Sequence, residues 1–305
     1  MPIETYHIPA LLKESINGLD IKPEGIYADV TFGGGGHSRA IMSALGPEGR
    51  LYGFDQDIDA QANSINDSRF TFVYSNFRFL RNFMLYYGVE HLDGIMADLG
   101  VSFHHFDSPD RGFSFRADGP LDMRMNRNAT LTAAKIIDEY TVDQLTQLFR
   151  LYGELRQSRQ IAQTIEKARR QAPITSTARL LDVIRPCIDP KHEKKELAQV
   201  FQALRIEVND EMDALRQFLE QALLTLKPGG RLCVITYHSL EDRLVKNFMR
   251  SGNFDGKIET DFYGRSLAPF RLLTSKPVSP GQDEVDRNPR SRSAKLRIAQ
   301  RSEKI

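Results

Sequence analysis

The chain has 305 residues, of which 41% are apolar, so it can bury a sizeable core and is longer than a usual single domain. Its 41 basic and 40 acidic residues leave a net charge of +1, so any nucleic-acid surface would depend on local clusters of cations. Cys187 and Cys233 show no disulfide or zinc-ligand spacing, which is typical of a reducing compartment. The N-terminal residues lack a signal-peptide pattern, and no apolar run has the length of a membrane span. We therefore expect a cytoplasmic protein with no membrane partner.

The first hundred residues predict strands that alternate with helices. Apolar runs typical of strands lie at 25–32, 50–57, 70–77 and 93–100. A glycine loop follows the first run and leads into a helical stretch at 38–46. The alternation returns late in the chain, with a helix at 209–226, a strand at 231–239, a helix at 240–249 and two further strands at 270–275 and 294–301. This order predicts a parallel α/β sheet.

The middle of the chain interrupts this pattern. Between 106 and 205 there is almost no strand signal, and apolar residues recur at helical spacing in 141–153, 155–171 and 177–188. We therefore expect two domains. Residues 1–105 and 206–305 would form one discontinuous sheet domain, and residues 106–205 would form an inserted all-helical domain that recognises the substrate.

The glycine loop predicts a nucleotide-type cofactor site. Four glycines, Gly33 to Gly36, follow a strand directly, so the backbone can approach a ligand where a side chain would collide. Asp55 ends the next strand, where a carboxylate can accept the ribose hydroxyl protons. The dinucleotide pattern G-x-G-x-x-G is absent, because its third position is Ser38 in one register and Arg39 in the other. The loop therefore favours S-adenosylmethionine, which carries no pyrophosphate.

Longer sequence blocks run in order along the whole chain. They are H-I-P-A-L-L-K-E (7–14), D-V-T-F-G-G-G-G-H-S (29–38), D-L-G-V-S (98–102), D-S-P-D-R-G-F-S-F (107–115), D-G-P-L-D-M-R-M (118–125), F-Q-A-L-R-I-E-V-N (201–209), Y-H-S-L-E-D-R (237–243) and N-P-R-S-R-S-A-K-L-R (288–297). With these blocks the chain resembles the bacterial small-subunit ribosomal RNA methyltransferase H family. Two segments depart from the family pattern, S-F-H-H at 102–105 in place of S-S-x-Q and K-K-E-L-A-Q-V at 194–200, which lacks A-T-R-T.

The resemblance implies a fold, a reaction and a cofactor site. The fold would be a Rossmann-like class I methyltransferase sheet, and the reaction N4-methylation of a cytidine at the decoding centre of small-subunit (16S) ribosomal RNA, with S-adenosylmethionine as donor. The partner would be this RNA within the assembled small subunit. The implied cofactor-binding residues are Gly34, Gly35, Gly36, His37, Asp55, Phe77, Asp98 and His105.

The reaction makes specific demands on the site. An exocyclic cytosine amine is a poor nucleophile, so acceptors must hold its protons and align the nitrogen with the methyl carbon. Asp98 and the carbonyls that follow it are suitably placed acceptors, and we expect Asp98, Tyr237 and His238 to be the catalytic residues. Phe113, Phe115, Tyr237 and His238 are candidates for stacking on the target base, although the two phenylalanines could equally be core residues and Tyr237 could simply end a strand. No metal is expected.

RNA contacts are predicted in two basic regions. One is the insertion, with Arg124, Arg127, Arg156, Arg159, Lys167, Arg169 and Arg170; the other is the tail at 287–297. The predicted contacts are Arg111, Phe113, Arg124, Arg290, Arg292 and Lys295. A solvated helix face and a charge-protected edge strand are the structural alternatives. An RNA-binding assembly factor without turnover and a DNA amino-methyltransferase remain rival functions, and the sequence leaves the oligomeric state, a homodimer included, open.

Overall fold

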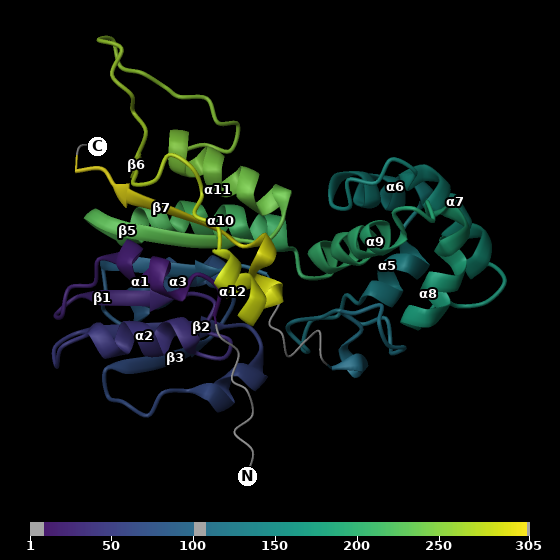
Figure 1. The fold of residues 1–305 in the computed structure, drawn as a ribbon, viewed down its shortest axis with the longest axis horizontal. Helices are drawn as coiled ribbons and strands as arrows, with labels where there is room; N and C mark the ends of the chain where they lie inside the picture. Colours follow the sequence, from purple (N-terminus) through teal and green to yellow (C-terminus); the bar gives the residue numbers. More distant parts are fainter. Residues whose placement is uncertain (1–8, 101–107, 304–305) are drawn as a thin grey trace. The chain divides into compact units, whose positions relative to one another are not determined.

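The computed structural model describes residues 9–100 and 108–303, which divide into two compact units (Figure 1). The sheet unit comprises Met1–Gly100 and Asp213–Ile305, and the helical unit comprises Val101–Met212. The later boundary of the helical unit lies beyond the predicted residue 205, because the helix Glu193–Val208 belongs entirely to this unit. Within the described ranges, no helix is long and apolar enough to cross a membrane.

The sheet unit contains a seven-stranded sheet in the order β3-β2-β1-β4-β5-β7-β6. Strands β1 to β5 are parallel to one another, whereas β7 is antiparallel to both of its neighbours, β5 and β6. The strands are β1 (Ile26–Asp29), β2 (Arg50–Asp55), β3 (Phe70–Tyr74), β4 (Leu92–Asp98), β5 (Leu226–Thr236), β6 (Phe270–Leu272) and β7 (Lys295–Arg301). The order reverses between β1 and β4, and ligands of open parallel sheets bind outside the carboxyl ends of the strands at such a point. The predicted Rossmann-like α/β sheet is confirmed.

Helices cover both faces of this sheet. On one face, α1 (Leu12–Leu19) contacts α2 (Gly36–Ala44), and their apolar residues pack with alternate residues of β5 and β7, such as Cys233 and Ile235. On the other face, Phe83 of α3 (Leu80–Tyr86) meets Phe54 with 6.0 Å between ring centroids. The helices α10 (Glu211–Thr225) and α11 (Ser239–Ser251) complete the set. The sequence did not predict α1 or α3, because each is only about two turns long.

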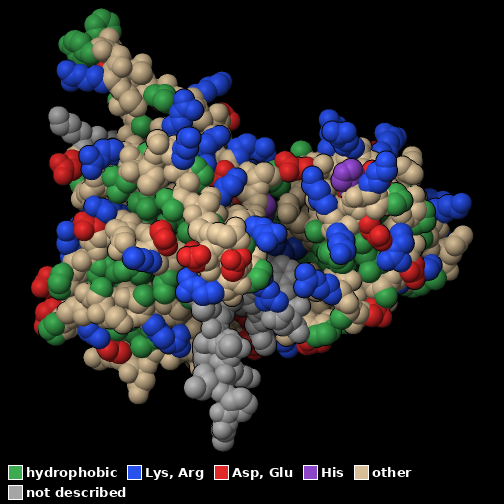
Figure 2. Space-filling view, viewed as in Figure 1, with side chains coloured by type: hydrophobic (Ala, Val, Ile, Leu, Met, Phe, Trp, Pro, Cys, Tyr) green, Lys and Arg blue, Asp and Glu red, His purple; other side chains and the backbone are tan. Residues whose placement is uncertain are grey.

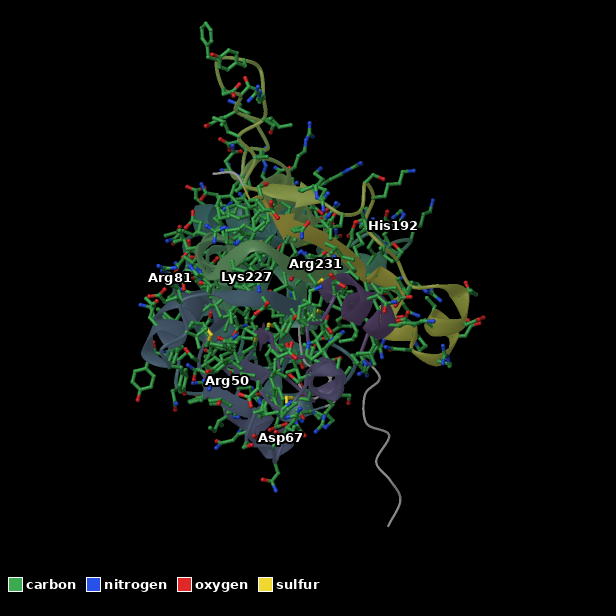
Figure 3. All side chains as sticks on the ribbon, turned by 90° about the vertical axis from the view of Figure 1, so that its left-hand side faces the viewer. Arg50, Asp67, Arg81, His192, Lys227 and Arg231 are labelled. Carbon is green, nitrogen blue, oxygen red and sulfur yellow. The ribbon has the colours of Figure 1, made fainter. Side chains whose placement is uncertain are left out.

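Polar side chains tie together the end of the sheet at which the parallel strands begin. Asp93 accepts a 2.9 Å hydrogen bond from the backbone N–H of Ile26 and pairs with Lys227. Arg231 donates to Asp20 at 2.9 Å and to the Gly18 carbonyl at 3.0 Å. Figure 3 labels Lys227 and Arg231 on this face. Since these charges are paired with each other, they stabilise the fold and leave the opposite edge for a ligand.

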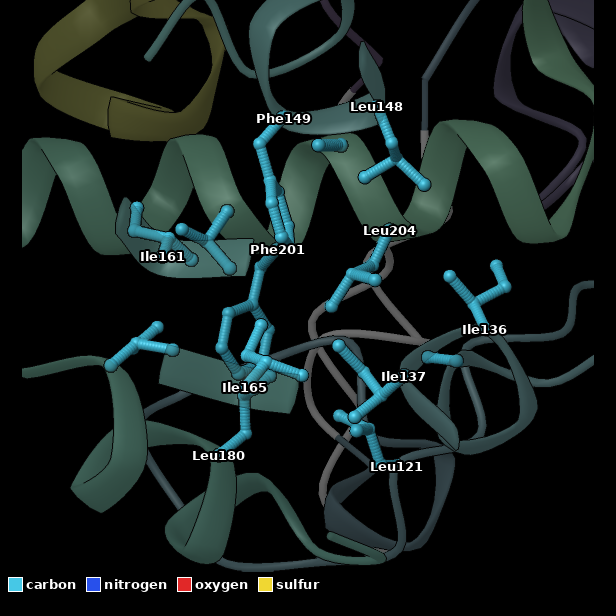
Figure 4. Close-up of a cluster of buried hydrophobic side chains, with 14 of the residues drawn as sticks. Leu121, Ile136, Ile137, Leu148, Phe149, Ile161, Ile165, Leu180, Phe201 and Leu204 are labelled. Atoms are coloured by element: carbon cyan, nitrogen blue, oxygen red, sulfur yellow. The ribbon is translucent and has the colours of Figure 1, made fainter. Parts of the chain in front are cut away.

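The helical unit has its own apolar core (Figure 4). Its helices are α5 (Ala133–Glu139), α6 (Val142–Leu151), α7 (Ser158–Arg169), α8 (Thr177–Ile184) and α9 (Glu193–Val208). The buried side chains drawn in Figure 4 include Phe149, Ile165, Leu180 and Phe201, which come from four of these helices. Full burial of such side chains contributes roughly 1.5 to 3 kcal/mol each, so the unit has a substantial core of its own.

The strand predicted at 294–301 is present as β7 (Lys295–Arg301), and short helical segments precede it. After α12 (Gln282–Arg287), the short helix η5 (Pro289–Ser293) holds Arg290 and Arg292, and β7 begins only at Lys295. Strand alternation therefore does not apply to Arg290 and Arg292, because Pro289 starts a helical turn instead of a strand. The alternative that this strand is an edge strand is wrong, because β7 lies between β5 and β6.

Candidate active site

Three aspartates end neighbouring parallel strands of the sheet unit. Asp29 is the last residue of β1, Asp55 of β2 and Asp98 of β4. Because the strands are parallel and in register, these side chains gather at one edge of the sheet, next to the glycine loop that follows β1. The sequence pattern of apolar runs ending in acids therefore leads to an acidic cluster at the switch point of the sheet.

The structure explains the glycines of the loop in different ways. Gly35 has φ of +73°, and an added Cβ would lie 3.0 Å from the Phe32 ring, so this position requires glycine for the fold. At Gly36 a Cβ would lie 2.8 Å from Pro9. At Gly34, by contrast, a Cβ would meet nothing within 4 Å. The absence of a side chain at Gly34 therefore leaves open space beside the backbone, as a bound ligand requires.

Asp55 connects the second strand to the glycine loop. One carboxylate oxygen accepts a 2.8 Å hydrogen bond from the backbone N–H of Gly33, and the other accepts one of 2.8 Å from Asp57. Asn63 donates to the Gly33 carbonyl at 3.0 Å from the other side of the loop. Each carboxylate oxygen has a second lone pair, so Asp55 can accept two further hydrogen bonds from a diol.

Asp98 lies between two polar side chains from other elements. The Tyr237 hydroxyl, just beyond the end of β5, donates to Asp98 Oδ1 at 2.8 Å. Nδ1 of His37, at the start of α2, is 3.7 Å from Asp98 Oδ2. The other His37 nitrogen, Nε2, is 3.2 Å from the Ala10 carbonyl, which can only accept, so Nε2 carries a proton. The structure thus brings together Asp98, Tyr237 and His37, which the sequence analysis predicted separately as site residues.

His238 has a structural role at the start of α11. Its ring caps the helix by accepting from the Glu241 backbone N–H, and Nε2 lies 3.1 Å from Glu241 Oε1. Glu241 is 2% exposed and also accepts a 3.0 Å hydrogen bond from the Tyr237 backbone N–H. The cap fixes the chain direction at Tyr237 and so helps to hold the tyrosine hydroxyl on Asp98.

Burial raises the pKa of all three aspartates. The pKa of Asp29 and that of Asp55 rise to about 6, and that of Asp98 rises to about 7. Burial is the largest cause in each case, and the charge of Asp29 raises the pKa of both neighbours further. Hydrogen bonds to Asp98 from Tyr237 and to Asp29 from Ser38 act in the opposite direction. A cation beside the cluster would favour the ionised forms of these aspartates.

This shift predicts a pH-dependent stability. Since the pKa of Asp29 in the folded state is raised above its ordinary value of 3.8, its contribution to stability is fully present below about pH 4 and is lost as the pH rises through 6. We expect Asp29→Asn to gain up to about 3 kcal/mol in unfolding free energy relative to wild type between pH 4 and pH 7. Urea titrations without a methyl donor measure this difference, with exposed Glu48→Gln as control. A difference that is constant with pH would contradict the assignment.

Two predicted cofactor residues remain, Phe77 and His105. Phe77, in the short helix η2 (Phe77–Phe79) after β3, is partly exposed and packs edge-on against Phe218 with 5.4 Å between ring centroids. It follows the third strand at the same carboxyl edge as the aspartates. His105 lies outside the described residues.

Two predicted RNA contacts of the helical unit are buried. Phe113 is 3% exposed within the core, so its ring offers no face to a base, and Phe115 packs against Phe201. Arg111 is 4% exposed and donates to the carbonyls of Arg124 and Met125. These placements correct the prediction for Phe113 and Arg111, which serve the core of the unit instead.

The cations predicted to bind RNA differ in their exposure and in the contacts that they make within the protein. Arg124 is held by Asp122 at 2.7 and 2.8 Å and by the carbonyls of Arg127 and Ala129. In the tail, Arg290 and Arg292 are exposed, while exposed Lys295 lies 3.7 Å from Asp242. The tail therefore presents more accessible charge than Arg124 does.

Sequence reasoning missed several residues that organise the site. The Thr31 hydroxyl accepts a 2.6 Å hydrogen bond from the Asp98 backbone N–H, and Ser38 donates to Asp29 at 2.6 Å. Glu241 was also overlooked as a partner of Tyr237 and His238. Its signal was present in the spacing of His238 and Glu241, which places a cap and an acid three residues apart at the start of a helix.

Comparison with known proteins identifies the family. The model of the MraW methylase family matches residues 4–302. The chain belongs to this family. The prediction of a methyltransferase that uses S-adenosylmethionine agrees with membership in this methylase family and with the α/β sheet described above.

Relatives of high identity cover nearly the whole chain. Proteins named "Ribosomal RNA small subunit methyltransferase H" from Parabacteroides distasonis and Bacteroides thetaiotaomicron are 62% and 60% identical over 297 residues. These alignments cover 97% of this chain and 97% and 98% of the relatives. A protein of the same name from Flavobacterium johnsoniae is 52% identical over 296 residues, with 97% of this chain and 98% of the relative covered. The resemblance inferred from the sequence blocks is confirmed.

Proposed function

We propose that this protein transfers a methyl group from S-adenosylmethionine to the exocyclic N4 amine of a cytidine in small-subunit (16S) ribosomal RNA, at the decoding centre. The observation that carries the proposal is the contact of Asp98 with Tyr237 at the carboxyl edge of the sheet, beside the glycine loop. The names of the relatives supply the class of RNA.

The acidic edge suits a cationic methyl donor better than a dinucleotide. Burial and the charge of Asp29 raise the pKa of Asp55 and of Asp98. A pyrophosphate would add negative charge beside these carboxylates, whereas a sulfonium would bring a positive one. Asp55 has free lone pairs for the ribose hydroxyls, and Gly34 leaves space beside the loop. When bound, the donor supplies an electrophilic methyl group. Gly34, Gly35, Gly36, His37, Asp55, Phe77, Asp98 and His105 are the residues that we propose to hold it.

A single methyl group at Gly34 tests this use of the loop. Because an added Cβ would enter open space, Gly34→Ala should leave the melting temperature unchanged or slightly raised, yet weaken donor binding by about tenfold or more. Gly35→Ala is the matched control, since its positive φ and the Phe32 ring make it destabilising instead. Calorimetry of donor binding and thermal melts measure both effects. Wild-type donor affinity in Gly34→Ala would place the ligand elsewhere.

Asp98 is the proposed acceptor for the target amine. An ionised Asp98 can accept a proton of the amine, which keeps the nitrogen lone pair out of the ring and directs it toward the methyl carbon. Tyr237 donates to one carboxylate oxygen and so fixes the direction of the other. His37 and the cap formed by His238 and Glu241 hold this pair in place. His238 is a positioning residue in this proposal.

We propose that exposed cations of both units hold the RNA backbone. In the helical unit, Lys and Arg side chains lie over much of the face seen in Figure 2, and its exposed cations include Arg127, Arg156, Arg159, Lys167 and Arg170. Arg290, Arg292 and Lys295 are their counterparts in the tail of the sheet unit. Guanidinium groups pair with phosphate oxygens and position an RNA without reading its sequence.

The experiment is a transfer assay with radiolabelled donor and three acceptors: small ribosomal subunits that lack the modification, bulk RNA, and DNA. The proposal predicts label in small-subunit RNA of the assembled particle. Label in DNA alone would support a DNA methyltransferase, and RNA binding without transfer would support an assembly factor without turnover. Either result would overturn the proposal.

A further inference from the structure

A narrow arm extends from the sheet unit between α11 and β6, at residues 257–267 (Figure 1). Figure 2 shows hydrophobic side chains gathered at its tip, with basic side chains beside them. The tip consists of Phe262, which is 98% exposed, and Tyr263, which is 79% exposed. Exposure of a phenylalanine to this degree contributes nothing to the core, so the fold alone does not explain this ring.

The backbone of the arm presents the two rings on an ordered turn. Asp261 and Arg265 are joined by a 2.9 Å hydrogen bond from the Asp261 N–H to the Arg265 carbonyl, and Leu267 N–H donates to Glu259. The Asp261 side chain accepts from the backbone N–H groups of Tyr263 and Arg265 at 2.9 and 2.8 Å. Gly264 closes the turn with φ of +77°. Such a turn usually carries polar residues at its centre, and here it carries two aromatic ones.

The tip combines the two chemistries that bind unpaired bases. The Phe262 and Tyr263 rings meet edge to face with 5.6 Å between centroids, and the Arg265 guanidinium lies 5.6 Å from the Tyr263 centroid. Single-stranded RNA is recognised by stacking on aromatic rings and on guanidinium planes. Because the turn is held by its own hydrogen bonds, little ordering entropy would be lost on binding.

We propose that this arm, the aromatic arm, binds unpaired bases of the RNA substrate by stacking, away from the methylated nucleotide. The inference rests on the proposed function, since it takes small-subunit RNA as the partner. The size of the tip favours RNA over a protein partner. Two aromatic rings bury about 150 to 250 Å² each and so about 300 to 500 Å² together, which is roughly half of the 800 Å² that each side of a stable protein interface contributes. Stacking on one or two bases needs no larger area.

The test compares three variants in equilibrium binding to small ribosomal subunits. The double variant Phe262→Ala with Tyr263→Ala removes both rings, and we expect it to bind at least about tenfold more weakly. The exchange variant Phe262→Tyr with Tyr263→Phe keeps both rings and should bind like wild type. Tyr86→Ala removes another exposed ring, 79% exposed on α3, and should also bind like wild type. Donor affinity and melting temperature should not change in any of the three.

A photo-reactive p-benzoylphenylalanine in place of Phe262 then identifies the partner on the subunit. An adduct with ribosomal RNA supports the proposal. An adduct with a ribosomal protein, or wild-type affinity of the double alanine variant, would overturn it. Failure of the proposed function would look different from both outcomes. If the proposed function is wrong, the wild-type protein itself would neither bind nor methylate the subunits.

Discussion

Asp98→Ala is expected to lower the single-turnover rate of methyl transfer by at least about a hundredfold while the protein stays folded. The carboxylate is the proposed acceptor for the target amine, and loss of one such positioned group typically costs two to four orders of magnitude. The residue ends β4 with a partly exposed side chain, so its removal leaves no large cavity. Glu90→Ala, an exposed acid just before the other end of β4, is the matched control. A rate within threefold of wild type in Asp98→Ala would remove this residue from the reaction.

The same carboxylate should set the pH dependence of the reaction. Burial raises the pKa of Asp98 to about 7, and only the ionised form can accept an amine proton. The kcat/KM for the donor, which reflects enzyme without bound donor, should therefore fall about tenfold for each pH unit below 7. Tyr237→Phe removes a hydrogen bond that lowers this pKa, so the fall should begin at a higher pH in that variant. A pH profile that is flat from 6 to 8 in wild type would contradict this role.

Asp55→Ala should weaken donor binding by about 1.5 to 3 kcal/mol, because two ribose hydroxyls would lose a charged acceptor. The change also removes the hydrogen bond that the Gly33 N–H donates to Asp55, so the glycine loop itself should loosen. Asp55→Asn is the informative second variant, since it keeps one acceptor oxygen for Gly33 but loses the charge.

Isothermal calorimetry measures the donor affinity of both Asp55 variants. Glu48→Ala, at the turn before β2 and thus at the opposite end of this strand, is the control and should bind normally. Unchanged affinity in both Asp55 variants would exclude Asp55 from the donor site.

Much of the sheet unit could be predicted because its signals are local. Each of the first strands is a short apolar run, and those of β1, β2 and β4 end in an acid at the edge that forms the site. The four glycines after β1 marked the loop for the same reason. What could not be predicted is the contact of Tyr237 with Asp98, because 139 residues separate them and only the order of the strands brings them together.

The helical unit was harder to predict in detail. The helix α9 has buried residues on several of its sides, among them Val200, Ala203 and Ile206. Its apolar residues therefore do not form a single face. The block D-G-P-L-D-M-R-M carried part of the family resemblance, and much of it builds the helical unit: Asn209 accepts from the Met125 N–H and donates to the Met123 carbonyl. At Gly119 a Cβ would lie 2.0 Å from the Pro109 carbonyl oxygen. Sequence blocks alone do not separate such structural roles from substrate contacts.

We propose above that Asp98 directs methyl transfer to the N4 amine of a cytidine in small-subunit RNA. The most direct measurement is mass spectrometry of nucleosides and of nuclease fragments of RNA from unmodified small subunits, after incubation with donor and either wild-type protein or Asp98→Asn. We expect N4-methylcytidine at a single decoding-centre position with wild type and at least a hundredfold less with Asp98→Asn, which retains the shape of the side chain but not its charge. Methylation of another base or atom by wild type, or equal N4-methylcytidine from both proteins, would contradict the claim.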